Sequence, residues 1–326
     1  MNIFMEEVKT DSGLKQIIES ARTAREIYLT RRPVSVAFPE IDAILDGGLE
    51  AGNFYLFLGA AKSGKTTTLR SLAIRAARTG YPVLYVNFEQ PGENSLAKIY
   101  NMLNRSSFQR DIVYSPEETA RRIESFEQDL QVGAKKLERL PFWIAFWPKD
   151  LDPVAFNITI KQKLSESIAE IREKDPEKRK PLVILENLSD IYNERVNGRD
   201  SLTNIVTQTA QDIKRFAMSE DVAILLAHHS GKIHGEEPTL DDVRDSKRVV
   251  DLAHSIFTTY VEDYEDALGF QQFRRVLKYM GGRGMSDPRR WIVRLDGVDV
   301  ELEDYTEPPK KSNSKRKVVA SEGVQV

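Results

Sequence analysis

The sequence predicts an α/β fold, in which a mostly parallel central sheet is flanked by helices. From Val34 to about Asp304, short apolar runs typical of strands alternate with longer segments in which apolar residues recur every three or four positions. The strand-like runs are apolar at nearly every position, as expected when helices cover both faces of a sheet. A glycine-containing loop joins the first of these runs to the first long helix. We therefore expect one α/β domain over residues 34–305.

Two flanking segments differ from this domain in composition. Residues 1–33 contain a single apolar stripe at helical spacing between positions 11 and 29, which predicts an amphipathic helix or linker. That helix either folds back on its own domain or docks on a neighbouring subunit. Residues 306–326 carry Pro308-Pro309 and several lysines, and this composition predicts a disordered basic tail. Weak contact with nucleic acid is one use of such a tail, and plain solvation is the other.

The predicted elements follow one another in a regular order. Each strand is a short apolar run bounded by polar residues, glycine or proline. The predicted strands are 54–59, 82–88, 142–146, 182–186 and 222–227. A helix over 66–79 is closed by Gly80, a charged helical stretch between Gly92 and Arg139 is expected at the sheet edge, and 153–174 and 201–219 are crossover helices.

Composition excludes several classes of function. The 326 residues include no cysteine and only four histidines, which excludes disulfides and cysteine-bound metals and makes a histidine metal site unexpected. No apolar run approaches the roughly 20 residues that span a bilayer, and the acidic N-terminus does not resemble an export signal. We expect a cytoplasmic protein with no membrane partner. The net charge of −3 confines any DNA contact to local loops.

The loop after the first strand fits the phosphate-binding pattern G-x-x-x-x-G-K-[ST] without a mismatch. In such a loop the backbone N–H groups surround the phosphates, the lysine reaches the β- and γ-phosphates, and the hydroxyl of the last residue binds Mg²⁺. The motif therefore predicts a nucleoside triphosphate and Mg²⁺ as ligands, with Lys65 as a catalytic residue and Thr66 on the metal. The nucleotide-binding residues are Gly59, Ala60, Ala61, Lys62, Ser63, Gly64, Lys65, Thr66 and Thr67.

Three further polar residues follow predicted strands. Glu89 comes after the second strand, where a carboxylate can polarise the water that attacks the γ-phosphorus. Glu186 ends the strand over 182–186 and is suited to hold the water shell of Mg²⁺ near Thr66. His229 follows the strand over 222–227 and can sense the γ-phosphate. Because neighbours on a strand point to opposite faces, His228 and His229 do not form a metal site.

This order of phosphate loop, Glu89, Glu186 and His229 resembles the RecA-type ATPase core, and several stretches resemble the helicase domain of DnaB-type replicative helicases. The likeness covers about residues 34–300. The resembling stretches are Phe38 to Leu49, Thr239 to Ser246, Val250 to Ser255, and the region from Arg275 to Asp296. The segment His228 to Lys232 is also similar to plasmid RepA-type helicases. The resemblance implies a RecA-like P-loop NTPase fold with antiparallel hairpin strands at the C-terminal end.

The last stretch resembles the hairpin whose basic residues reach the γ-phosphate of a neighbouring subunit. The resemblance assigns that role to Lys278 and Arg283. Three positions depart from the family pattern. Glu186 stands where the family usually has Asp, His229 where it often has Gln, and Met280 where it commonly has an arginine.

The resemblance implies a Mg²⁺-ATP-dependent, ring-forming motor that acts on single-stranded DNA as a replicative helicase. The expected ring is a hexamer. The expected setting is a bacterial, phage or plasmid replication system. Other replication proteins are then expected partners. The DNA contacts fall in two loops, with Arg195 and Arg199 in the first and Lys232 and His234 in the second. Two alternatives remain open, because fold resemblance does not separate them. One is an ATPase that mediates recombination or acts as a clock-like assembly, and the other is a helicase-loading or assembly factor without unwinding activity.

Overall fold

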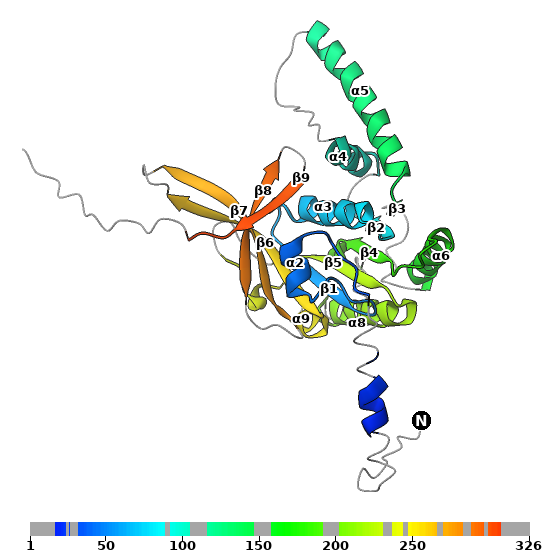
Figure 1. Ribbon diagram of the computed structural model, residues 1–326. Helices are drawn as coiled ribbons and strands as arrows, with labels where there is room; N and C mark the ends of the chain where they lie inside the picture. Colours follow the sequence, from blue (N-terminus) through cyan, green and yellow to red (C-terminus); the bar gives the residue numbers. More distant parts are fainter. Residues whose placement is uncertain are drawn as a thin grey trace, which may run out of the picture.

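Figure 1 shows the computed structural model of the protein. The residues that the structure describes are 17–23, 26, 32–88, 92–104, 116–146, 158–191, 202–230, 237–243, 247–265, 270–282, 288–296 and 299–307. Within them, no helix is both long enough and apolar enough to cross a bilayer.

A nine-stranded sheet forms the centre of the domain, in the order β3-β2-β4-β5-β1-β6-β7-β8-β9. All neighbouring strands from β3 to β6 in this order are parallel, and those from β6 to β9 are antiparallel. This confirms the predicted mostly parallel sheet with C-terminal antiparallel strands. The strands are β1 Phe54–Gly59, β2 Val83–Asn87, β3 Phe142–Phe146, β4 Leu182–Glu186, β5 Ala223–His229, β6 Ser255–Glu265, β7 Gln271–Gly282, β8 Arg289–Asp296 and β9 Asp299–Asp304.

Helices cover both faces of the sheet and bury its apolar side chains. The helices are α2 Pro39–Ile44, α3 Lys65–Arg78, α4 Gly92–Asn104, α5 Pro116–Glu138, α6 Ile158–Lys174, α7 Leu188–Ile191, α8 Leu202–Glu220 and α9 Arg248–Leu252, with a short 3₁₀ helix η1 at Leu240–Asp242. Apolar side chains of α2, α3 and α4 form one core, which includes Tyr85 and Leu225 from the sheet. Those of α6 to α9 form the second core, which includes Leu84 and Ile224. Successive strand residues therefore alternate between the two cores.

Strand β1 lies in the middle of the sheet and carries the phosphate loop at its carboxyl end. It pairs with β5 on one side and β6 on the other, so that Gly59 lies beside both His229 and Thr259. All six residues of β1 are buried. The loop that follows is thereby placed next to residues that lie far away in the sequence.

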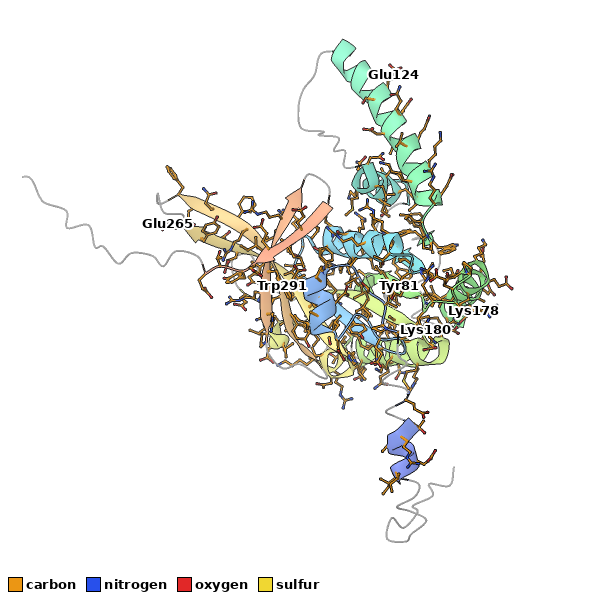
Figure 2. The ribbon with its side chains drawn as sticks, viewed as in Figure 1. Tyr81, Glu124, Lys178, Lys180, Glu265 and Trp291 are labelled. Carbon is orange, nitrogen blue, oxygen red and sulfur yellow. The ribbon has the colours of Figure 1, made fainter. Side chains whose placement is uncertain are left out.

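A long hairpin extends from the antiparallel side of the sheet. Strands β6 and β7 pair from Ser255 with Gly282 to Glu265 with Gln271. Figure 2 shows Glu265 at the outer end of this hairpin and Trp291 of β8 close to the body of the domain. Phe270 and Phe273 are 63 % and 66 % exposed near the hairpin end.

Two helical segments stand apart from the sheet. Figure 1 shows α5 projecting beyond the body of the domain, with α4 alongside its inner part. At the N-terminal end, residues 17–23 are helical and their side chains are exposed, including Ile17 and Ile18 of the predicted apolar stripe.

Candidate nucleotide site

The phosphate loop has the strand-loop-helix setting that its sequence predicts. Gly59 ends β1, and α3 begins at Lys65, so the free N–H groups of the first helical turn face the loop. Gly64 has a φ of 96°, a left-handed conformation that favours glycine at this turn. A Cβ on Gly59 would lie 2.6 Å from Ser63 Oγ and 2.7 Å from Thr259 Oγ1, so this position also requires glycine. The backbone therefore fits a cradle for phosphates.

A side-chain hydrogen bond ties the loop to β6, the strand at which the parallel and antiparallel parts of the sheet meet. Ser63 Oγ and Thr259 Oγ1 are 2.9 Å apart and both residues are buried. Thr259 is the β6 partner of Gly59, so the bond joins the loop to the strand that starts the long hairpin. The hydroxyl of Ser63 thus positions the loop, while its backbone lies in the predicted phosphate cradle.

Lys65 and the predicted sensor lie together at the same edge of the sheet. Lys65 is 5 % exposed, and its Nζ lies 3.5 Å from Nδ1 of His229 at the end of β5. His228 is fully buried and, as the preceding strand residue, points to the opposite face. The alternation expected from the sequence therefore places only His229 on the phosphate side. Its sensing role stays a prediction.

Glu186 is buried at the carboxyl end of β4, on the face that α3 covers. The hydroxyl of Tyr85, from the neighbouring β2, donates a hydrogen bond to Glu186 Oε2. Burial, followed by the charge of Glu186, raises the pKa of Tyr85 well above its ordinary value, so the phenol stays protonated and donates. Among the described residues, Glu186 Oε1 is buried and has no hydrogen-bond partner. This oxygen fits the predicted role of accepting a bond from water bound to Mg²⁺ near Thr66.

Buried polar residues connect α3 and α4 to the end of β2. Arg70 of α3 donates a hydrogen bond to Ser95 Oγ at 3.2 Å, and Asn87 Nδ2 donates to the same oxygen at 2.6 Å. All three residues are buried. Asn87 is the last residue of β2, two positions before the predicted base Glu89, so this network fixes the strand end from which Glu89 follows.

The predicted trans-acting lysine is engaged within its own chain. Lys278 Nζ lies 2.6 Å from Glu237 Oε1 and donates a hydrogen bond to the carbonyl oxygen of Pro238 at 3.5 Å. Arg290, the β8 partner of Lys278, also pairs with Glu237, at 3.4 Å. Glu237 lies within the predicted DNA loop, residues 230–239, that contains Lys232 and His234. To reach a neighbouring subunit, Lys278 would have to exchange this carboxylate for a phosphate.

Six predicted site residues lie outside the described residues. They are the base Glu89, the hairpin residue Arg283 and the DNA-loop residues Arg195, Arg199, Lys232 and His234. The structure brings together Lys65 and His229 at one edge and places Glu186 on the same face, whereas Lys278 lies on the antiparallel side. Sequence reasoning missed Tyr85, Thr259 and Glu237. Tyr85 and Thr259 lie inside strands, where nothing in the pattern distinguishes them from core residues, and Glu237 lies in a polar loop.

Comparisons with known proteins agree with this architecture. Residues 23–235 match the protein family described as AAA domain (AAA_25). The structure resembles a solved structure of an ATPase domain, with a TM-score of 0.65 and 16 % identity over 92 % of this chain and 100 % of that one. It also resembles a structure of a DnaB-like replicative helicase described with its interactions with primase, with a TM-score of 0.66 and 16 % identity over 90 % of this chain and 70 % of that one.

Comparison with curated protein sequences gave no match. The family match covers more than half of the sequence, and both structural similarities extend over nearly the whole chain. The chain therefore belongs to the AAA domain family, and its fold is the RecA-like ATPase fold of DnaB-type helicase domains.

Proposed function

We propose that this protein is an ATP-hydrolysing, ring-forming motor that acts on single-stranded DNA, as a replicative DNA helicase of the DnaB or RepA-like type. One observation carries the proposal. The phosphate loop lies between β1 and α3 with Lys65 beside His229, and the buried Glu186, on the same sheet face, keeps one carboxylate oxygen without a hydrogen bond from the described residues. A phosphate cradle, a buried cation and a carboxylate on one face are the parts that phosphoryl transfer requires.

The residues divide the work of hydrolysis as follows. The loop backbone and Lys65 bind the phosphates. Thr66 and Glu186 would hold Mg²⁺, which would supply positive charge to the phosphates. Glu89 takes the proton of the attacking water, and His229 responds to the γ-phosphate from the end of β5. Tyr85 orients Glu186 by its hydrogen bond.

The motor function requires contacts beyond one subunit. Lys278 and Arg283 act on the γ-phosphate of the neighbouring subunit, and the loops with Arg195, Arg199, Lys232 and His234 bind the DNA backbone. The exposed apolar residues Ile17 and Ile18 favour docking of the N-terminal helix on a neighbour over packing on its own domain. We place the protein in the cytoplasm of a bacterial, phage or plasmid replication system, where other replication proteins are its partners.

Steady-state ATP hydrolysis with and without single-stranded DNA tests the proposal. We expect Mg²⁺-dependent hydrolysis that rises with DNA, and separation of a forked duplex with one tail polarity. The Lys65→Ala protein serves as the inactive control in both assays. Hydrolysis that is indifferent to DNA, together with no strand separation, would indicate an assembly factor. The absence of ATP hydrolysis under all conditions would contradict the enzyme assignment itself.

A further inference from the structure

Arg275 of β7 lies against the phosphate loop of its own chain. A Cβ on Gly64 would lie 3.2 Å from Cδ and 3.5 Å from Nε of Arg275. The strand register explains this contact. Arg275 pairs with Val261 of β6, and Val261 points to the same face as Thr259, the residue that binds Ser63 of the loop. The stem of Arg275 thus rests on the loop at the start of α3.

The charge of Arg275 is not neutralised by the described part of the chain. Its Nε is buried and has no hydrogen-bond partner there, and no carboxylate of those residues forms an ion pair with it. The preceding residue differs, because Arg274 forms an ion pair in which its Nε lies 2.6 Å from Glu262 Oε2. Arg275 is half-buried, and withdrawing part of an unpaired guanidinium from water is costly, so an anion at this position would be stabilised.

Arg275 and Lys278 of β7 point to opposite faces of the sheet. Arg275 shares the α3 face with Leu277, the partner of Thr259, whereas Lys278 pairs with Thr258 and points to the other face. Lys278 is held there by Glu237. Arg275 therefore faces the phosphate loop of its own chain, and Lys278 does not.

We propose that Arg275 binds the phosphate chain of the nucleotide held in its own subunit, as a second cation beside Lys65. This inference rests on the proposed nucleotide site. Phosphate is the anion that a loop of this kind binds, and a planar guanidinium can donate two parallel hydrogen bonds to phosphate oxygens. Arg275 is thus a binding residue that acts in cis, distinct from the residues that reach across to a neighbour.

Equilibrium binding of ATP, ADP and adenosine to the full-length protein tests this assignment. Two neutral variants are compared with the parent, namely Arg275→Gln and Arg275→Met, the second of which keeps the unbranched stem on Gly64. We expect both variants to bind ATP and ADP about tenfold or more weakly than the parent, because a charge-assisted hydrogen bond to phosphate is lost. Both should bind adenosine as the parent does. Arg294→Gln removes an arginine that is 66 % exposed on the neighbouring β8 and should bind all three ligands normally.

Two further measurements separate this role from others. Without nucleotide, the melting temperature of Arg275→Met should equal or exceed that of the parent, because the variant removes an unpaired cation that is half-buried and keeps the stem on the loop. A fall in melting temperature with unchanged ATP affinity would show that Arg275 is structural. An equal loss for ATP and adenosine would assign it to the base or ribose and overturn the phosphate contact.

The outcome for Lys65→Ala distinguishes failure of this inference from failure of the proposed function. If Lys65→Ala loses ATP affinity and both Arg275 variants keep it, only the role of Arg275 is wrong. If Lys65→Ala also binds ATP like the parent, the nucleotide site itself is wrong. Mixing Arg275→Met with Lys65→Ala should restore no ATPase activity, since each defect lies in the nucleotide site of its own subunit.

Discussion

The parallel and antiparallel halves of the sheet hold their functional side chains in different ways. In the parallel half, neutral hydrogen bonds between buried groups fix the site, as between Ser63 and Thr259, or a neutral donor meets a carboxylate, as from Tyr85 to Glu186. In the antiparallel half, Lys278 and Arg290 are held by ion pairs with the partly exposed carboxylate of Glu237. The side chains of Lys278 and Glu237 are 14 % and 40 % exposed.

This difference matches the two tasks proposed for the halves. Buried hydrogen bonds are costly to break, so they keep the phosphate loop, Glu186 and its surroundings in one geometry. Partly exposed ion pairs contribute only about 0–1 kcal/mol and can be exchanged at small cost. A cation held in that way can leave its own chain for the phosphate of a neighbour, so the antiparallel half is suited to contacts between subunits.

The largest expected effect lies in the parallel half. Lys65→Ala should abolish ATP hydrolysis and leave the fold intact, because it removes the charge on the β- and γ-phosphates but no core packing. Steady-state ATPase assays together with circular dichroism check this. Lys135→Ala, at an exposed position of α5 outside the loop, is the matched control and should retain activity. If Lys65→Ala hydrolyses ATP near the parent rate, the assignment of this loop to the nucleotide site is wrong.

Complementation between subunits tests whether basic residues of the antiparallel half act on the nucleotide of a neighbouring subunit. Arg283→Ala or Lys278→Ala should lower the ATPase rate by up to about 10³–10⁵-fold if the residue acts as a finger in trans. Mixing either protein with Lys65→Ala should then restore part of the activity, because each protein supplies what the other lacks. With mixed assembly demonstrated by mass measurement, a lack of recovery would show that the residue acts in cis or has no catalytic role.

Glu89→Gln tests the base that is expected after β2. It should retain ATP binding and lose turnover by about 10²–10⁴-fold, the usual contribution of a general base. Binding is measured by nucleotide titration and turnover by phosphate release. A variant that no longer binds ATP would instead point to a structural role for Glu89.

The smallest expected effects are changes in the free energy of unfolding, measured for one variant in each half of the sheet. Tyr85→Phe leaves the buried Glu186 without the hydrogen bond to Oε2 and should lower the free energy of unfolding by about 1–3 kcal/mol. Glu237→Gln removes a partly exposed ion pair and should cost about 1 kcal/mol or less. Denaturant unfolding measures both. The reverse order would contradict the proposed division into a fixed half and an exchangeable half.

Much of the parallel half could be predicted from the sequence, because its determinants are local. The loop pattern and the apolar runs beside it predicted β1 and the start of α3 to within a residue, and the strand ends predicted where Glu186 and His229 lie. The spatial order of the strands could not be predicted, since short apolar runs do not specify their neighbours. Pairing of β1 with both β5 and β6 is what brings Thr259 to the loop.

The antiparallel half was less predictable, because its contacts depend on register and on loops. The adjacent arginines 274 and 275 look alike in the sequence, yet one forms an ion pair and the other lies on the phosphate loop. Their opposite directions follow from strand alternation only once β7 is paired with β6. Likewise, Glu237 is an ordinary loop residue until the fold places it beside Lys278.

The central position of β1 also determines when the nucleotide site can form during synthesis. Its partners arrive late, because Phe54 pairs with Ile224 and Leu56 with Ile256, about 170 and 200 residues further along the chain. At about 5–20 residues per second, a ribosome needs some 10–40 seconds to supply them. Until then the apolar strand that bears the phosphate loop lacks both neighbours, and such long-range pairing is slow in itself. The nascent chain therefore acquires its nucleotide site only after residue 256 has been added, and until then β1 lacks one or both of its strand neighbours.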